Sequence, residues 1–251
     1  MTLSLDSTSV FRGGRAILDD ASITCAPGCF TALCGPNGAG KTTALSVMSG
    51  ALRADKGRAT LEERNIRSFA SVELARRRAV VSQNSVLTFP FEVHEVIAMG
   101  RAPHYGRSTP KRDRQIIAEV IDLMGLQTFA ERRFTTLSGG ERQRVHIARA
   151  LVQVWEAPDE DAKRWLLLDE PTAALDLKHQ ISLMRLLQRL ASDGWGVVAV
   201  LHDLHLVKSH TDEVILFKSG AIAAAGPTKE ELTAGRVKDV FDLDEAYSLS
   251  A

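Results

Sequence analysis

The segment Gly35 to Thr42 contains the residue types and spacing of a phosphate-binding loop. It reads GPNGAGKT and fits the pattern G-x-x-x-x-G-K-[ST], with an apolar run before it and a helix-forming run after it. Glycines allow the backbone to curl so that its N–H groups face one point, and the following helix N-terminus adds positive potential there. We expect Lys41 to contact the β- and γ-phosphates of ATP, and the Thr42 hydroxyl to be a ligand of Mg²⁺.

A pair of carboxylates follows a second apolar run, Trp165 to Leu168. Consecutive apolar residues of this kind are typical of a central parallel strand that is buried on both faces. Asp169 and Glu170 come at the C-terminal end of this strand, where open α/β sheets bind their ligands. We expect Asp169 to hold the magnesium ion and Glu170 to polarise the water molecule that attacks the γ-phosphate.

The motif LSGGE, at Leu137 to Glu141, predicts a second anion site. Ser138 is followed three residues later by Glu141, which is the spacing of a capping box at the start of a helix. A helix start with a flexible Gly-Gly pair attracts anions. Because the phosphate loop already has its own site, this second one is free to face another nucleotide. The two motifs together predict an active site that is shared between two copies of the chain.

The order of these motifs resembles that of the ATP-binding subunits of ABC transporters. Along the chain it runs from the phosphate loop through Gln83, LSGGE and LLLDEPT to His202. Three segments are similar to the iron-chelate and cobalamin importer class, and most of all to haemin importer ATPases: Arg76 to His104, Trp165 to Gln180 and Val198 to Leu206. The resemblance implies ATP hydrolysis that powers haem import, with ferric siderophores or cobalamin as the alternative substrates.

The resemblance also implies a role for each motif residue. Gln83 would touch Mg²⁺ and the attacking water, and His202 would contact the γ-phosphate. The opposite subunit's γ-phosphate would lie on the LSGGE motif, and Asp176 would cross the dimer interface. The implied catalytic residues are Glu170, His202 and Gln83, and the implied metal ligands are Thr42, Gln83 and Asp169. The implied nucleotide-binding residues are Phe11, which would stack on adenine, and Gly35, Pro36, Asn37, Gly38, Ala39, Gly40, Lys41, Thr42, Thr43, Ser138, Gly139, Gly140 and Asp176.

These motifs must be positioned by an α/β fold whose parallel core sheet brings the phosphate loop and the carboxylates to one edge. We expect a P-loop nucleotide-binding cassette with an antiparallel β subdomain and an inserted helical subdomain. Residues 1–251 would form a single ABC ATPase domain, with residues 1–83 and 156–251 as the α/β core and residues 84–155 as the helical subdomain. Thr228 is predicted to cap a final short helix, and the acidic segment 155–164 to be a solvated surface loop.

Composition and charge restrict the class of protein further. The formal net charge is zero, which argues against a nucleic-acid partner. The sequence has no apolar run long enough to span a membrane and no signal peptide at its start. The three cysteines fit no common zinc pattern and are predicted to be small buried side chains.

The expected location is therefore the cytoplasmic face of the inner membrane, as a peripheral homodimer. Its partners would be two transmembrane permease subunits and, indirectly, a periplasmic binding protein. A soluble ABC ATPase of translation or DNA repair is the alternative from another class. Those proteins usually carry two cassettes or a long coiled coil, and neither feature is present in this sequence.

Overall fold

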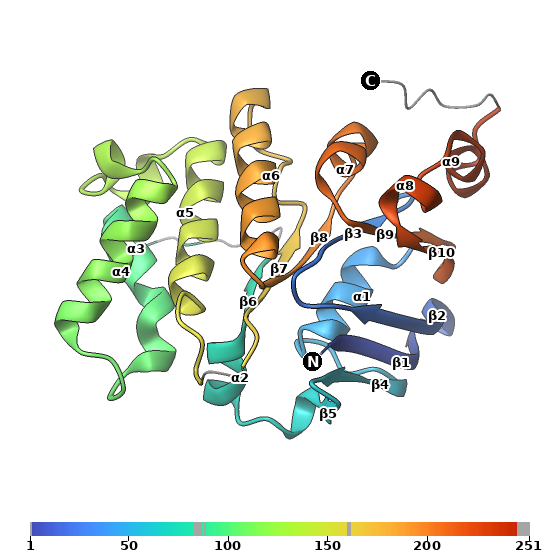
Figure 1. Cartoon of the computed structure of the whole chain (residues 1–251), viewed down its shortest axis with the longest axis horizontal. Helices are drawn as coiled ribbons and strands as arrows, with labels where there is room; N and C mark the ends of the chain where they lie inside the picture. The colour runs from blue at the N-terminus through green and yellow to red at the C-terminus, as the bar shows by residue number, and fades with distance from the viewer. Residues whose placement is uncertain (1, 83–86, 88, 160–161, 245–251) are drawn as a thin grey trace.

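The computed structural model describes residues 2–82, 87, 89–159 and 162–244, and its strands form two sheets (Figure 1). The larger sheet has six strands in the order β10-β9-β3-β8-β7-β6. These are β3 (Phe30–Cys34), β6 (Arg78–Val81), β7 (Trp165–Asp169), β8 (Gly196–Val200), β9 (Glu213–Lys218) and β10 (Ala221–Pro227). All neighbours are parallel except β9 and β10, which pair antiparallel at one end of the sheet. The parallel core sheet is therefore confirmed.

The three strands at the centre of this sheet, β3, β7 and β8, are buried along their whole length. Alternate residues face opposite sides, so that Leu167 packs in one apolar cluster with Leu45 while Leu166 and Leu168 pack in the other. Burial on both faces explains why these strands are continuously apolar in sequence. Because the strands are parallel, the segments that follow β3, β7 and β8 all leave from the same edge of the sheet.

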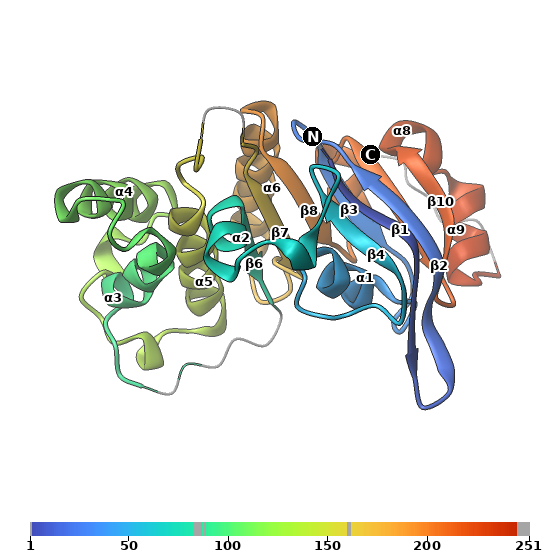
Figure 2. The same ribbon diagram turned by 90° about the horizontal axis from the view of Figure 1, so that it is seen from below.

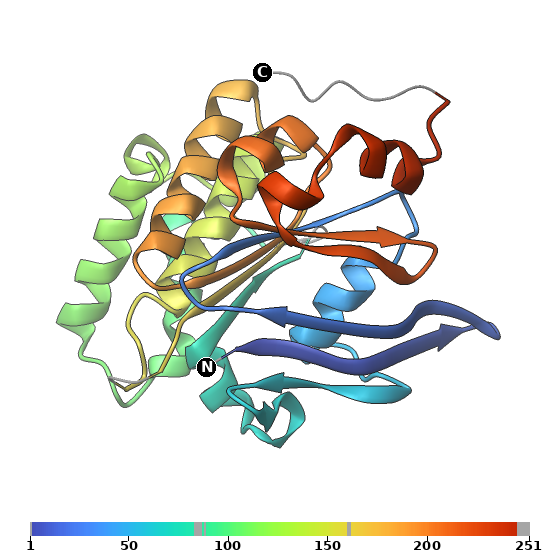
Figure 3. The same ribbon diagram turned by 45° about the vertical axis from the view of Figure 1, so that its right-hand side comes forward.

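The smaller sheet is antiparallel and has the order β2-β1-β4-β5. Its strands are β1 (Leu3–Arg12), β2 (Arg15–Cys25), β4 (Lys56–Leu61) and β5 (Arg64–Asn65). Helix α1 (Lys41–Met48) lies between the two sheets and contacts strands of both (Figure 3). This arrangement confirms the predicted antiparallel β subdomain and places the start of α1 next to β2.

Helices that follow the core strands cover the other face of the larger sheet and form a lobe beside it. Figure 2 shows this lobe at one end of the molecule and the C-terminal helices at the other. The lobe contains α3 (Val93–Ala98), the 3-10 helix η2 (Met99–His104), α4 (Pro110–Leu123), η3 (Gln127–Phe129), η4 (Phe134–Thr136) and α5 (Gly139–Gln153). The remaining helices are η1 (Ile66–Ser68), α2 (Ser71–Arg77), α6 (Leu177–Ser192), α7 (Leu204–His210), α8 (Thr228–Glu231) and α9 (Ala234–Phe241). In the described ranges, no helix is long and apolar enough to cross a membrane.

Two expectations about local structure were wrong. Thr228 does not cap a helix: Pro227 is the N-cap of α8, and the buried Thr228 hydroxyl lies 2.9 Å from that of Thr211. The acidic segment after α5 is only partly solvated, because Glu156 accepts hydrogen bonds from the guanidinium groups of Arg101 and Arg112. Both departures come from partners that are distant in sequence. Cys25 and Cys34 are buried as expected, and burial raises the pKa of each thiol to about 12, whereas Cys29 is only partly buried.

Candidate nucleotide-binding site

The loop between β3 and α1 is held in a conformation that only glycine adopts easily. Gly35, Gly38 and Gly40 have φ angles of 145°, 77° and 102°. A Cβ atom at Gly35 would lie 2.2 Å from the Phe217 carbonyl oxygen, and one at Gly40 would lie 2.7 Å from that of Ile17. The loop is therefore packed closely between β9 and β2, and the backbone is free to line a cavity of about 140 Å³ with residues 37–43, Ile17 and Glu170.

Lys41 is the first residue of α1 and is only 5% exposed. Its Nζ donates hydrogen bonds to the carbonyl oxygens of Gly35, at 2.7 Å, and Pro36, at 2.8 Å. An ammonium group has three N–H donors, so one remains for a phosphate oxygen. Burial lowers the pKa of Lys41, although the nearby carboxylates of Glu170 and Asp169 oppose this shift. The α1 N-cap, Gly40, offers no side-chain acceptor, which leaves the first backbone N–H groups of the helix to a ligand.

The carboxylate at the end of β7 meets the start of α1. The Thr42 hydroxyl donates to Asp169 Oδ1 at 3.0 Å, although 127 residues separate the two in sequence. Asp169 is 5% exposed, and burial raises the pKa of its carboxyl group, with a further contribution from the Glu170 charge. A hydroxyl and a carboxylate oxygen are the hard donors that Mg²⁺ prefers. The donor set at this position therefore fits a magnesium ion.

Glu170 has the left-handed backbone conformation, with φ of 50°. For a residue other than glycine this costs about 1–3 kcal/mol and is found mostly where the surrounding structure fixes a functional side chain. His202, which follows β8, brings its Nε2 within 2.8 Å of Glu170 Oε1. Because an ionised carboxylate only accepts hydrogen bonds, the imidazole in this pair would carry its proton on Nε2 and donate to Glu170 Oε1.

The predicted residue Phe11 does not line this cavity. Phe11 is near the end of β1, where it pairs with Ala16, and Lys56 Nζ lies 5.7 Å from its ring centroid. The cavity at the phosphate loop is lined instead by the next residue along β2, Ile17. Ile17 was missed by sequence reasoning, because only the β1–β2 register shows that it reaches the loop. Gln83 lies outside the described residues.

The LSGGE motif lines a second and larger cavity of about 690 Å³. Ser138 caps α5, and its predicted capping box is present: Ser138 Oγ accepts from Glu141 N, and Glu141 Oε2 accepts from Ser138 N at 2.7 Å. Asp176 lines the same cavity and caps α6, with its Oδ1 accepting from His179 N at 2.9 Å. One chain thus brings Ser138 and the adjacent glycines together with Asp176.

The two cavities have no lining residue in common. Residues Lys41, Thr42, Asp169, Glu170 and His202 form one group, while the LSGGE motif and Asp176 form another. The segment 171–175 runs between them and is held by two glutamine side chains, from α5 and α6. Gln143 Nε2 donates to the Pro171 carbonyl oxygen at 3.4 Å, and Gln180 Nε2 donates to that of Thr172 at 3.1 Å.

Comparison with known proteins agrees with this geometry. The ABC transporter family matches residues 18–173. A hemin import ATP-binding protein of Bradyrhizobium diazoefficiens is 43% identical over 93% of this chain and 86% of its own length. One of Rhizobium meliloti, with the same name, is 42% identical over 93% of this chain and 88% of its own length.

Solved structures with the same fold include a metal-chelate type ABC transporter in an inward-facing conformation. It is 27% identical, with a TM-score of 0.79 over 96% of this chain and 89% of its own. A dimeric ATP-binding cassette bound to ADP and phosphate is 25% identical, with a TM-score of 0.78 over 90% of this chain and 98% of its own. The family match and the 43% identity over most of both chains place the protein: it is a nucleotide-binding ATPase domain of the ABC transporter family.

Proposed function

We propose that this protein is the ATP-hydrolysing subunit of a membrane importer and that the imported substrate is haem. The assignment of haem as the substrate rests on the similarity to proteins named for hemin import, at 43% identity over 93% of this chain. The three sequence segments that resemble haemin importer ATPases point the same way. ATP is the expected nucleotide, and Mg²⁺ its expected metal ion.

The group around the phosphate loop supplies the chemistry of hydrolysis. Lys41 Nζ and the N–H groups at the start of α1 would hold the β- and γ-phosphates, while Thr42 and Asp169 would hold Mg²⁺. When bound, this ion neutralises charge that develops on the phosphate oxygens. The Glu170 carboxylate would accept a proton from the attacking water, since it lies in the same cavity as the phosphate loop.

The other predicted residues support this reaction from nearby positions. His202 donates to Glu170 Oε1 at 2.8 Å, so it would fix the direction of the carboxylate as well as reach the γ-phosphate. Phe11 would stack on adenine beside residues 37–43 of the loop. Gln83 would contact Mg²⁺ and the water.

We further propose that two copies of the chain close head-to-tail around two ATP molecules. The separation of the two cavities supports this proposal. The LSGGE cavity contains no residue of the phosphate loop, so its anion site would not contact a nucleotide bound to the phosphate loop of the same chain. Ser138, Gly139 and Gly140 would bind the γ-phosphate held by the partner copy, and Asp176 would cross the interface. The dimer would act on two permease subunits at the cytoplasmic face of the inner membrane, with a periplasmic binding protein delivering the substrate.

The domain boundaries belong to this proposal too. Residues 1–83 and 156–251 would move as the nucleotide-binding core, and residues 84–155 as the helical part that carries LSGGE. The 3-10 and α-helices between Val93 and Gln153 lie together beside the sheet, which supports this division (Figure 1).

The test is ATP hydrolysis by the protein reconstituted in liposomes with its permease. Hydrolysis should rise when a haem-loaded binding protein is added, and rise less with carriers of ferric siderophore or cobalamin. If a cobalamin or siderophore carrier stimulates hydrolysis and the haem carrier does not, the assignment of haem as the substrate is wrong, while the assignment as an ATPase stands. If no permease preparation changes hydrolysis, the transport assignment itself fails.

A further inference from the structure

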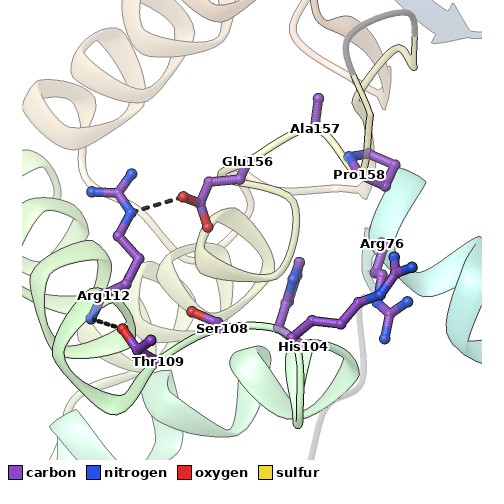
Figure 4. A pocket seen from close by; sticks show the side chains of 9 residues that line it. Arg76, His104, Ser108, Thr109, Arg112, Glu156, Ala157 and Pro158 are labelled. Atoms are coloured by element: carbon purple, nitrogen blue, oxygen red, sulfur yellow. Dashed lines mark hydrogen bonds and ion pairs between the residues drawn. The ribbon is translucent and has the colours of Figure 1, made fainter.

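A cavity of about 570 Å³ lies outside the two nucleotide cavities, and none of its lining residues lines either of them. Its walls come from the end of α2, the junction between η2 and α4, and the residues that follow α5. Figure 4 shows Arg112 and Glu156 on one side of this cavity and Arg76 on the other, with His104 and Ser108 between them. We call it the arginine cavity.

The acidic side chain in the arginine cavity is already paired. Glu156 accepts from Arg112 Nε through Oε1 at 2.7 Å, and from Arg101 through Oε2 at 3.1 Å. The Arg101 side chain is only 4% exposed and also donates to Asp113 and to the Val152 carbonyl oxygen. Both carboxylate oxygens of Glu156 are therefore directed to guanidinium groups, and these ion pairs connect the wall of the cavity to the buried Arg101.

Two further guanidinium groups line the cavity without a carboxylate partner among the residues described. Arg76 Nε donates to the Pro103 carbonyl oxygen at 2.7 Å, which holds the side chain and leaves its terminal N–H groups available. Arg107 is exposed, and neither it nor Arg76 forms an ion pair within the described ranges. The lining thus contains three guanidinium groups and one carboxylate, so it is positively charged overall.

Neighbouring groups add to this preference for anions. Thr109 lines the cavity and caps the 14-residue helix α4, so the positive end of the helix dipole faces the same space. His104 is 7% exposed and its Nε2 lies 2.8 Å from the Gln153 carbonyl oxygen. Burial lowers the pKa of His104, with Arg101 and Arg76 acting in the same direction, so this ring adds no positive charge at neutral pH. The charge of the cavity therefore comes from its arginines.

We propose that the arginine cavity is a binding site for a phosphate group carried by a small molecule or by a lipid headgroup. A guanidinium group binds phosphate oxygens through two parallel N–H donors. A site with two guanidinium groups that have no carboxylate partner in the described ranges, beside the N-cap of a helix, matches a phosphate better than a carboxylate or a neutral ligand. A volume of about 570 Å³ leaves room for an organic group beside the phosphate. This site is independent of the proposed haem transport and of the nucleotide-binding residues.

The experiment measures phosphate binding in a chain whose phosphate loop is weakened. Inorganic phosphate is titrated calorimetrically into the Lys41→Ala protein, and then into the same protein with Arg76→Ala and Arg107→Ala added. We expect saturable binding in the first and a loss of about tenfold in affinity for each arginine removed, because a hydrogen bond to a charged group contributes about that much. Arg53→Ala with Arg67→Ala is the matched control, since it removes the same charge from a different cavity.

A second arm separates the two sources of phosphate. Flotation with phosphatidylcholine vesicles, with and without phosphatidic acid, is compared for the wild-type chain and for Arg76→Ala with Arg107→Ala. Loss of vesicle binding only in the arginine variant assigns the site to a lipid headgroup, whereas phosphate binding without vesicle binding assigns it to a soluble ligand. Retained ATP hydrolysis and an unchanged melting temperature show that the variant is folded, and Arg107→Glu offers a single exposed change that should also abolish binding. The proposal is overturned if phosphate does not bind, if the arginine variant binds it as the Lys41→Ala protein does, or if the control pair loses as much.

Discussion

Replacing Glu170 by glutamine tests the proposed base with little disturbance of the site. Glutamine has the same length and keeps an oxygen that accepts from His202, whose Nε2 lies 2.8 Å from Oε1. The backbone at this position, with φ of 50°, suits the two residues about equally. What the substitution removes is the negative charge and the ability to take a proton.

The expected effects differ greatly in size. Loss of a general base lowers the rate about 10²- to 10⁴-fold, which corresponds to about 3–5 kcal/mol in the activation free energy. The hydrogen bond from His202 changes from a charged to a neutral one, which costs about 1 kcal/mol of stability before solvent screening is considered. A domain with about 5–15 kcal/mol of stability stays folded after such a loss, so unfolding cannot account for the drop in rate.

The assay is phosphate release at saturating ATP and Mg²⁺, with the affinity for a fluorescent ATP analogue measured in parallel. We expect unchanged nucleotide affinity, a rate lowered at least 100-fold and an ATP-bound dimer on gel filtration. Glu63→Gln is the matched control: Glu63 is an exposed glutamate that also has a positive φ, 63°, and it lies in the β4–β5 turn, outside the lining of this cavity. Turnover of Glu170→Gln close to that of the control would refute the proposed base.

The same substitution has a consequence for magnesium. The Glu170 charge raises the pKa of Asp169, in addition to the larger effect of burial. A raised carboxyl pKa means that protonation, and with it loss of Mg²⁺, begins at a higher pH on acidification than for an ordinary aspartate. In Glu170→Gln the Mg²⁺ dependence of nucleotide binding should therefore persist to lower pH than in the wild-type chain. An unchanged pH dependence in Glu170→Gln would mean that the two carboxylates are not coupled.

The other predictions concern binding, assembly and stability. Lys41→Ala removes a 5%-exposed cation from the phosphate loop, so binding of a fluorescent ATP analogue should weaken; unchanged affinity would mean that the loop is misassigned. Ser138→Arg fills the cavity proposed for the partner's nucleotide, so ATP-driven dimerisation should fail on gel filtration while monomer binding persists. A mixture of these two variants should regain some hydrolysis, and normal hydrolysis by Ser138→Arg alone would contradict a shared site. Glu156→Ala removes one hydrogen-bond partner of the buried Arg101 and should lower the free energy of unfolding by about 1–3 kcal/mol, measured as a melting temperature several degrees lower. Glu73→Ala, which removes an exposed ion pair, should lower the melting temperature by less.

The positions of the chemical groups were predictable because each is specified by a short local pattern. A continuous apolar run is enough to predict a strand buried on both faces, and β3 and β7 confirm this at Phe30–Cys34 and Trp165–Asp169. The residues that follow those strands must then emerge at one edge of the parallel sheet. The 3.0 Å contact between Thr42 and Asp169 is therefore a consequence of the strand order, although no pattern in the sequence joins them.

Elements stabilised by distant partners were harder to predict. Strand β4 (Lys56–Leu61) begins with three exposed residues and is held by its antiparallel pairing with β1, so its own sequence has no clear period. Arg101 lies in a stretch rich in glycine and proline, a composition typical of a loop, yet its side chain is 4% exposed. Its three partners come from α4, the last turn of α5 and the segment after it. Such contacts cannot be predicted from local sequence patterns, because they form only when the helices of the lobe pack against one another.

The contacts around residues 171–175 give the proposed dimer a physical route from assembly to hydrolysis. A Cβ atom at Gly140 would lie 2.8 Å from the Ala174 carbonyl oxygen, so the LSGGE motif rests directly on this segment. Gln143, one turn along α5, donates to the Pro171 carbonyl oxygen immediately after Glu170. If a partner's nucleotide moves the start of α5, the segment that carries Glu170 must move with it or lose these contacts. Because Glu170 is already held in a strained backbone conformation, with φ of 50°, a small displacement there would change the direction of its carboxylate, and hydrolysis would depend on the presence of the second copy.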